Sequence, residues 1–469
     1  MSFSIHAYQA IIIGAGPAGL FAAIQLAETS RAKNASRPTE ASQAKNVSNP
    51  AEASRVNNPI RHSGSVPTDG ASAEPVDQSS ILVLERKEKP ARKLLISGSG
   101  QCNLTHAGPI NNFLDHYGGG AKAQSAARFL KQALYNFDNQ ALLAWFGARG
   151  IEFETEENGK IFPIDRRASS ILKVLQDEAR RLAIQIETNS RVHSIRSSAD
   201  GFIIHVEGQE VSYRAPMVLI ATGGLSYPKT GSSGDGYTLA ASLGHTIVPP
   251  RPALSPVIIR DFALKSLAGL SFRDAELALL REGKRIATKR GDLLITHEGL
   301  SGPLILDSSR HIQPSDILEI NFLPDTLDVF RNRLDAELQA KPRRLVRALL
   351  SELGLTKSMA ELFCELANIP LKTTAASLPR ANREALCRLT CAQPFLVNHL
   401  GSLEIAMVTA GGIDLAQVKS GTMESRIVPG LFFAGEVLDI DGDTGGYNLQ
   451  AAFSTGTLAA SGMSQLIKS

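Results

Sequence analysis

The amino-acid sequence predicts an α/β protein in which one domain is built from both ends of the chain. An apolar strand at Ala10–Ile13 runs into a glycine-rich turn and then into a helix. The same order of strand, glycine turn and helix returns at residues 431–466. Between them, residues 253–324 show short apolar runs separated by turns, and residues 325–391 show Leu and Ala at helical spacing. A β-rich segment and a helical segment therefore interrupt the α/β domain.

Composition and charge narrow the classes of partner. The chain has 469 residues, 43% of them apolar and 20% charged, which is typical of a globular protein. Lys and Arg number 49 and Asp and Glu 46, so the chain lacks the strong positive net charge that would attract nucleic acid or an anionic membrane. Residues 10–27 are uncharged, but three glycines and a proline interrupt them, which argues against a membrane span. We expect a small-molecule substrate, no nucleic acid and no membrane association.

The four cysteines are Cys102, Cys364, Cys387 and Cys391, and they form no CxxC pair. The last two share a helical face, but neither a His nor a second cysteine pair accompanies them, so no metal site is predicted. Free thiols without a disulfide pattern are typical of a reducing compartment. A cytoplasmic location is therefore expected.

One segment near the N-terminus differs in composition from the rest. Residues 30–79 contain no Leu, Phe, Tyr or Trp and are rich in Ala, Ser, Asn and Pro. Such a segment cannot bury enough apolar surface to offset the entropy lost on ordering. We predict a disordered surface insertion over residues 29–79.

The turn after the first strand has the pattern GxGxxG, formed by Gly14, Gly16 and Gly19. Between a strand and a helix, this pattern is typical of dinucleotide binding. The first glycine permits the tight turn, the second lets the backbone approach a pyrophosphate, and the third allows close packing of helix on strand. The helix N-terminus then faces the anion.

An acidic residue at the expected spacing supports this interpretation. Glu85 follows the apolar run at residues 81–84 and lies 71 residues after Gly14. Without the 50 residues from 30 to 79 the spacing is 71 − 50 = 21, close to the roughly 20 residues that the fingerprint requires. An acid at this position binds a free ribose hydroxyl, which favours FAD or NAD over NADP.

Three further motifs resemble the FAD domain of the glutathione-reductase type. They are PAGL after Gly16, ATGG at residues 221–224, and LFFAGE at residues 431–436. In such domains the end of the chain returns to contact the flavin's ribityl phosphate. The resemblance implies bound FAD rather than NAD. Because no second complete strand–GxGxxG–helix unit follows, NAD(P)H would act only as a transient electron donor over the flavin ring.

Four longer motifs narrow the resemblance to one bacterial flavoprotein family, which includes aminoacetone oxidases and BaiN-type bile-acid dehydro-reductases. They are KLLISGSGQCN at residues 93–103, TAGGI at 409–413, TMES at 422–425 and GGYNLQ at 445–450. The similarity covers nearly the whole chain outside the insertion. It implies that the loop at residues 97–103 lies along the pyrophosphate and flavin, that Val192 meets the adenine, and that residues 445–450 present N–H groups to the pyrimidine end of the flavin.

Together, the fingerprint and the resemblance define a predicted FAD site with members in six segments. These are Gly14, Gly16, Pro17, Ala18 and Gly19; Glu85, Arg86 and Lys93; Ser97, Gly98, Ser99, Gly100, Gln101, Cys102 and Asn103; Val192; Ala221, Thr222, Gly223 and Gly224; and Gly435, Glu436, Gly446, Tyr447, Asn448, Leu449 and Gln450.

The chain departs from the family pattern at three positions. Ser99 and Gln101 stand where the family generally has Gly and Arg, and His106 stands where it has Asn. The loss of the Arg removes a charged contact to phosphate or to an acidic substrate. No catalytic acid or base is identified from the sequence.

Several residues leave two interpretations open. Cys102 is either a redox thiol beside the flavin or a packed thiol, and it lacks the second cysteine of a disulfide reductase. Tyr227 and Tyr447 either flank the flavin or merely cover it. His297, in a glycine-rich turn, is favoured as structural.

The predicted architecture is a Rossmann-like FAD domain at residues 1–225 and 426–469. A β-rich substrate domain at 226–324 and 395–425 interrupts it and carries a helical cap at 325–394, with the active site where they meet. The expected function is an FAD-dependent oxidoreductase of a small organic substrate, either an oxidase or a reductase. Two alternatives are a flavin-dependent RNA-modifying enzyme and a flavin-binding protein with a sensory or structural role.

Overall fold

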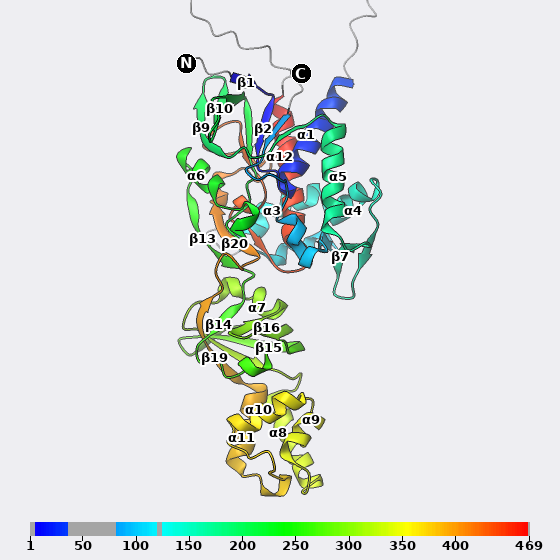
Figure 1. Cartoon of the computed structure of the whole chain (residues 1–469), viewed down its shortest axis with the longest axis vertical. Coiled ribbons are helices and arrows are strands. Elements are labelled where there is room, and N and C mark those ends of the chain that lie inside the picture. The colour runs from blue at the N-terminus through cyan, green and yellow to red at the C-terminus, as the bar shows by residue number, and fades with distance from the viewer. Residues whose placement is uncertain (1–4, 36–80, 120–123, 468–469) are drawn as a thin grey trace, which may run out of the picture.

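The computed structural model describes residues 5–35, 81–119 and 124–467. The chain forms three tiers along one axis: an α/β domain, a β-barrel and a group of helices (Figure 1). Both ends of the chain lie at the α/β domain, as the return of strand–turn–helix order near the C-terminus predicts. The predicted α/β class, with a β-rich and a helical segment inserted, is confirmed.

A five-stranded parallel sheet forms the core of the α/β domain, in the order β21-β12-β2-β3-β8. The strands are β2 (Ala10–Ile13), β3 (Ile81–Leu84), β8 (Gln185–Glu187), β12 (Met217–Ile220) and β21 (Leu431–Phe433). Strands buried on both faces are continuous apolar runs, which is why β2 and β3 lack alternating polar positions. Leu431 lies opposite Val218, so the C-terminal segment completes a sheet that the N-terminal segment begins.

Helices cover one face of this sheet (Figure 1). They are α1 (Pro17–Ala35), α3 (Ser125–Asn136), α4 (Asn139–Gly147), α5 (Ala168–Arg181) and α12 (Tyr447–Leu466). The first turns of helix α1 are apolar on all sides because α12, α5 and the sheet surround them, and Leu20, Phe21 and Ile24 are fully buried. At Gly456 of α12, a Cβ would stand 2.6 Å from the carbonyl oxygen of Ala18, so only glycine permits this close crossing.

Smaller elements complete the α/β domain. An antiparallel group, with β1 added in parallel, has the order β1-β11-β10-β9. Its strands are β1 (Ile5–Ala7), β9 (Val192–Ser198), β10 (Gly201–Val206) and β11 (Ser212–Ala215). The remaining pieces are β4 (Thr105–His106), α2 (Ile110–Phe113), β5 (Tyr117–Gly118), β6 (Phe153–Thr155), β7 (Lys160–Pro163), α6 (Asp235–Ser242) and β22 (Asp441–Gly442).

Two antiparallel strands, β13 (Ile247–Ala253) and β20 (Val408–Ile413), lead into the second tier. That tier is a closed barrel in the order β14-β17-β16-β15-β18-β19. Its elements are β14 (Val257–Ile259), β15 (Ser271–Arg281), β16 (Lys284–Ile295), β17 (Gly299–Ser301), α7 (Pro303–Leu306), β18 (Ile317–Asn321) and β19 (Gln393–Leu400).

The third tier contains α8 (Leu327–Ala340), α9 (Val346–Glu352), α10 (Lys357–Leu366) and α11 (Arg380–Cys391). Thr326 and Thr356 cap α8 and α10 with their side-chain oxygens. These helices share one apolar core with the barrel, separate from the core of the α/β domain. They lie at the end of the barrel away from the α/β domain (Figure 1), so they do not cap the domain junction as predicted.

Other predicted boundaries also need correction. Helix α1 continues to Ala35, so residues 29–35 are helical rather than part of a disordered insertion; the rest of that prediction lies outside the described residues. The barrel begins at residue 257 rather than 226, and residues 415–423 pack in the α/β core rather than with the barrel. Strands β15 and β16 have 11 and 12 residues and are not short. Among the described helices, none is long and apolar enough to cross a membrane.

Candidate functional site

A cleft of about 710 Å³ runs through the α/β domain and ends at its junction with the barrel. This volume lies within the range typical of small-molecule and cofactor sites. One wall consists of turns that follow the parallel strands, and the residue after β13, helix α7 and the start of β20 contribute to the other. The carboxyl ends of parallel strands are where ligands bind in open α/β sheets. The cleft reaches the junction between the two domains, where the sequence analysis expects the active site, and the position of that site stays a prediction.

The first glycine turn forms one end of the cleft with the geometry that the sequence predicts. Gly14 has a φ of +103°, and a Cβ there would stand 2.5 Å from the carbonyl oxygen of Ala221. A Cβ on Gly19 would stand 2.0 Å from the carbonyl oxygen of Gly14, so this glycine serves packing and does not line the cleft. At Gly16 nothing lies within 4 Å of a Cβ, so the backbone is open to a ligand.

Glu85 stands at the end of β3 beside this turn and lines the cleft. One carboxylate oxygen accepts a hydrogen bond from the N–H of Ala15 at 3.0 Å, and the other accepts one from the N–H of Lys87 at 2.9 Å. Burial raises the pKa of Glu85, and the two N–H donors oppose that rise. Each carboxylate oxygen retains acceptor capacity for a ribose hydroxyl.

Ion pairs join distant segments along the wall of the cleft. Lys93 Nζ lies 2.7 Å from Glu436 Oε2, so the loop after β3 is tied to the segment after β21. Arg86 Nη1 lies 3.0 Å from Asp235 Oδ2. In both pairs a carboxylate neutralises the cation, so that its charge is not available to a ligand.

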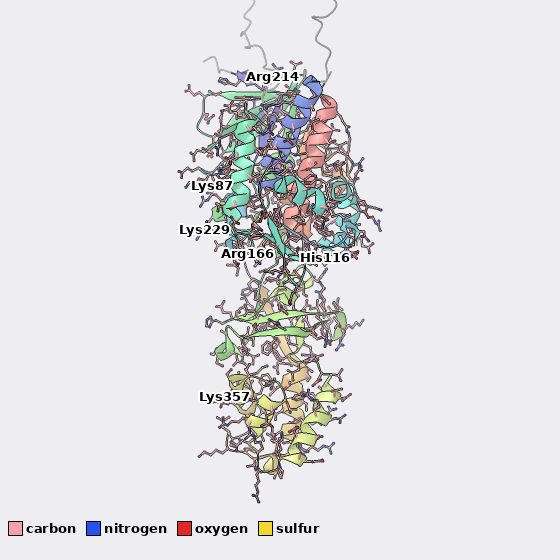
Figure 2. All side chains as sticks on the ribbon, turned by 90° about the vertical axis from the view of Figure 1, so that its right-hand side faces the viewer. Lys87, His116, Arg166, Arg214, Lys229 and Lys357 are labelled. Atoms are coloured by element: carbon pink, nitrogen blue, oxygen red, sulfur yellow. The ribbon has the colours of Figure 1, made fainter. Side chains whose placement is uncertain are left out.

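Two further cations, Arg92 and Lys160, line the cleft and face no carboxylate within 4.0 Å in the described part of the chain. Lys87, Lys229, Arg166 and His116 lie toward the barrel end of the α/β domain, whereas Arg214 lies at its opposite end (Figure 2). Arg92 and Lys160 therefore bring positive charge to the cleft, which suits a pyrophosphate, whereas Glu85 brings a carboxylate that forms no ion pair within the described residues.

Most predicted site residues line this cleft. They are Gly14, Gly16, Pro17, Ala18, Glu85, Arg86, Lys93, Ser97, Gly98, Ser99, Asn103, Val192, Ala221, Thr222, Gly223, Gly435, Glu436, Gly446, Asn448 and Leu449. The cleft brings together segments that lie more than 400 residues apart in the chain. Contact of each residue with FAD stays a prediction.

Seven predicted residues lie behind the wall instead: Gly19, Gly100, Gln101, Cys102, Gly224, Tyr447 and Gln450. Gln450 is buried and bonded to Thr105 and to the carbonyl oxygen of Phe137. A Cβ on Gly224 would stand 2.4 Å from Thr409 Oγ1, so this glycine is required by packing. The predicted motifs therefore contain both residues that face the cleft and residues that pack behind them.

The loop that departs from the family pattern shows why Ser99 is unusual. Ser99 has a φ of +57°, in the left-handed region that favours glycine. A serine backbone is strained there, which fits the glycine that the resemblance implies at this position. Gln101 does not line the cleft, and its Oε1 accepts a hydrogen bond from Arg166 at 3.2 Å. Arg166 also lies over the ring of Phe162, a wall residue, at 4.3 Å.

The structure shows where the residues with two open interpretations lie. Cys102 is fully buried, and burial raises the pKa of its thiol to about 12, so the thiolate that redox chemistry needs is absent at neutral pH. Tyr227 lines the cleft, whereas Tyr447 stacks between His106 and His116, with centroid distances of 5.2 and 4.1 Å. His297 lies in the turn between β16 and β17, away from the cleft.

The second glycine turn lies at the other end of the cleft, before α12. Gly445 and Gly446 have φ values of +117° and +94°, and a Cβ on Gly446 would stand 2.6 Å from the backbone of Thr105. The first-turn N–H groups of α12 lack acceptors within the helix. The side chain of Asn448 accepts from the N–H of Gly442 and donates to its carbonyl oxygen, each at 2.8 Å.

A charged cluster beside this turn was missed by the sequence analysis. Asp443 and Thr444 line the cleft, and Asp443 Oδ2 lies 3.1 Å from His116 Nδ1. Asp307 accepts hydrogen bonds from Thr444, and burial together with the charge of Asp443 raises the pKa of Asp307 to about 6. The DGDT run directly before the two glycines was a signal that could have indicated it.

The barrel side of the cleft is apolar. Leu254, Pro303, Leu306, Met407 and Val408 line it, and three of them form a separate small core. We call these five residues the apolar wall. Leu254 directly follows β13, Pro303 and Leu306 belong to α7, and Met407 and Val408 lie at the start of β20, which is why no single stretch of the sequence indicated them.

Comparison with known proteins agrees with this geometry. The family model described as the HI0933-like protein Rossmann domain matches residues 70–462. The chain belongs to the HI0933-like family. It is 33% identical over 399 residues to a 3-dehydro-bile acid delta(4,6)-reductase of Clostridium scindens, covering 83% of this chain and 94% of that protein. The predicted family is therefore confirmed.

Members of this family carry two kinds of name. A ribosomal RNA dihydrouridine synthase of Escherichia coli is 32% identical over 376 residues, covering 80% of this chain and 90% of that protein. Among solved structures, the 3-ketosteroid-delta4-(5alpha)-dehydrogenase of Rhodococcus jostii RHA1 is similar at 15% identity and a TM-score of 0.47, with 99% and 98% of the two chains covered.

The family membership makes the chain an FAD-dependent oxidoreductase. The residues present fit FAD. Gly16 leaves backbone open at a helix N-terminus for a pyrophosphate, and Glu85 offers carboxylate oxygens for a ribose. The cleft continues from there to the second glycine turn and the apolar wall.

Proposed function

We propose that this protein is an FAD-dependent reductase that saturates a carbon–carbon double bond conjugated to a carbonyl in a flat cyclic compound. The apolar wall carries the proposal, because it faces the cofactor cleft at the second glycine turn and offers no charge. A flat hydrocarbon ring that packs there would bury apolar surface against apolar side chains, which is favourable, and would exclude water from the cleft. The names of the relatives agree, since both describe the addition of hydrogen to a ring.

The residues of the chain have distinct roles in this proposal. Gly14, Gly16 and Glu85 hold the adenosine and pyrophosphate end of FAD. When bound, FAD supplies the hydride equivalent for such a reduction. The first-turn N–H groups of α12 stabilise negative charge at the pyrimidine end. Asp443 is the polar side chain of the cleft beside this turn, and His116 Nδ1 lies 3.1 Å from its Oδ2 and holds it in place.

The cofactor is the first part to test. Purified protein should be yellow and should release FAD on denaturation, because Glu85 requires an adenosine ribose. Release of FMN alone would contradict the site. We also propose that NAD(P)H is the reductant and binds transiently over the ring, which anaerobic mixing with NADH or NADPH would show as bleaching of the flavin absorbance.

Reoxidation of the bleached protein then tests the substrate class. A 3-keto steroid with a conjugated double bond should restore the flavin absorbance without O₂, and the matching saturated ketone should not. Reoxidation by O₂ alone, together with turnover of amines, would instead indicate an oxidase.

A second candidate is reduction of a uracil ring in RNA, which the names of the relatives from Escherichia coli and Haemophilus influenzae favour. The unpaired Arg92 and Lys160 in the cleft would meet phosphates. Reoxidation by a ribosomal RNA fragment, with binding that weakens steeply as salt rises, would support this candidate over the steroid. The nearly neutral net charge favours the small molecule, and the free, buried cysteines agree with a cytoplasmic location.

A further inference from the structure

The second glycine turn is contacted by side chains of its own domain and also by side chains of the barrel tier. Two consecutive glycines with positive φ values have no side chains to hold their own conformation. The segment before them, residues 441–444, meets side chains from residues 307 and 310 of the barrel tier. These two residues follow α7, whose Pro303 and Leu306 belong to the apolar wall.

Arg310 makes the first of these contacts. Its Nε lies 2.8 Å from Asp441 Oδ1, and its Nη2 lies 2.7 Å from Asp443 Oδ1. The angles fall outside those of a hydrogen bond, so these are close ion pairs. The side chain of Arg310 is 9% exposed and that of Asp441 is 2% exposed, so solvent screens the pairs little. Removal of the guanidinium would take the ion-pair partner from the buried Asp441 and would leave Asp443 with His116 alone, which is costly.

Asp307 makes the second contact. Its Oδ1 accepts a hydrogen bond from the backbone N–H of Thr444 at 2.7 Å, and its Oδ2 accepts one from Thr444 Oγ1 at 3.1 Å. Lys289 of β16 donates to the carbonyl oxygen of Asp307 at 3.3 Å. The barrel therefore holds the residue directly before Gly445 at both its backbone and its side chain.

We propose that Arg310 and Asp307 are positioning residues through which the barrel holds residues 441–446 in the conformation that receives FAD. Affinity for FAD then depends on a domain that contributes no part of the glycine fingerprint. The inference rests on FAD binding and is independent of the substrate. Wild-type protein that takes up no FAD would contradict the cofactor rather than this arrangement.

A second Arg–Asp pair with an equally buried carboxylate provides a control, although its Arg281 side chain is 31% exposed against 9% for Arg310. Arg281 Nε lies 2.8 Å from Asp316 Oδ1, and Asp316 is 2% exposed, as Asp441 is. This pair lies within the barrel tier, and neither residue lines the cleft. Arg281→Met should therefore lower the melting temperature without changing the dissociation constant for FAD by more than about twofold.

The experiment compares Arg310→Met, Arg310→Lys, Asp307→Asn and Arg281→Met in the full chain. The dissociation constant for FAD would be measured by flavin fluorescence, and backbone hydrogen exchange would be followed over residues 441–447 with and without FAD. Arg310→Met should raise the dissociation constant about tenfold, equivalent to about 1.4 kcal/mol, and should speed exchange in that segment. Arg310→Lys should rescue part of the loss, because it keeps the charge but cannot bridge two carboxylates as a guanidinium does.

Two results would overturn the proposal. One is wild-type FAD affinity and exchange in folded Arg310→Met. The other is an equal loss of affinity in Arg281→Met, which would show a general effect of destabilisation. If Arg310→Met does not fold, Arg310→Lys and Asp307→Asn decide: unchanged affinity and exchange in both would refute the proposal, and about a threefold loss in each would support it.

Discussion

The two glycine turns at the ends of the cleft are held in different ways. At the first, the close contacts of Gly14 and Gly19 are with backbone atoms of the α/β domain itself, at 2.5 and 2.0 Å. At the second, the segment before Gly446 is held by charged side chains from the barrel. Both turns therefore depend on backbone packing within the α/β domain, since a Cβ on Gly446 would also stand 2.6 Å from the backbone of Thr105. The second turn depends in addition on side chains of the docked barrel.

The largest expected effect breaks the first turn. Gly19→Val should abolish FAD binding and lower the free energy of unfolding by about 3 kcal/mol or more, because its Cβ would meet the carbonyl oxygen of Gly14 at 2.0 Å. Flavin absorbance and thermal unfolding would measure both effects. Gly147→Ala is the control: it lies in α4 with nothing within 4 Å of a Cβ, and it should be neutral or slightly stabilising. A stable, flavin-replete Gly19→Val protein would contradict the comparison.

The same substitution at the second turn should act on the cofactor more than on the fold. Gly446→Val places a Cβ 2.6 Å from the backbone of Thr105 and forces a positive φ on a β-branched residue. FAD occupancy should fall at least tenfold while most of the cooperative unfolding remains. Absorbance at saturating FAD and circular dichroism would separate the two effects. Full occupancy would remove this turn from the binding site.

The pH dependence of the free energy of unfolding should show a component from Asp307, which contacts the segment before the second glycine turn. Burial and the charge of Asp443 raise the pKa of Asp307 to about 6 against 3.8 for the free group, with Lys289 and the N–H of Thr444 opposing the rise. A raised carboxyl pKa stabilises the folded state below about pH 4, and this contribution is lost as pH rises through about 6. The contribution is about 3 kcal/mol at most. In Asp307→Asn, urea unfolding between pH 4 and 7 should lose this component; an unchanged profile would refute the assignment.

A smaller effect is expected from the side chain that ties α12 to the second turn. Asn448→Ala removes two hydrogen bonds to Gly442 and should lower FAD affinity only a few-fold. The reduction potential should shift downward, because the N–H groups of α12 would stabilise the reduced flavin less well. Dye-equilibrated titration measures the shift. Asn382→Ala, which removes a hydrogen bond to Ala367 in the helical tier, should leave the potential unchanged.

The smallest effect should come from shortening the insertion between α1 and β3. Deletion of residues 40–76 shortens the connection from 45 to 8 residues, about two and a half halvings, which changes the closure free energy by only about 1.5 kcal/mol. FAD content should stay unchanged, and the melting temperature should change only slightly. The described ends, Ala35 and Ile81, stay in place. Insoluble or flavin-free protein would show that the insertion has a structural role.

The sequence by itself determined the first turn and its partner acid. Gly14, Gly16 and Gly19 lie within six residues, and Glu85 follows β3, the strand that pairs with β2. Local geometry and one spacing were therefore sufficient to predict this part of the site. It also determined the order of the tiers, because strand and helix periodicities are local properties. The predicted start of the barrel was wrong, because the chain segments that cross between tiers have no periodicity that distinguishes them from their neighbours.

Only the tertiary structure decided what holds the second turn and what faces the flavin end of the cleft. Asp307 and Thr444 lie 137 residues apart, and Asp443 and His116 lie 327 residues apart. No periodicity connects such positions, because their contact depends on how whole domains pack. The apolar wall has the same origin, with members from residues 254, 303–306 and 407–408. Local chemistry is encoded in short motifs, whereas contacts between domains exist only once the domains have docked.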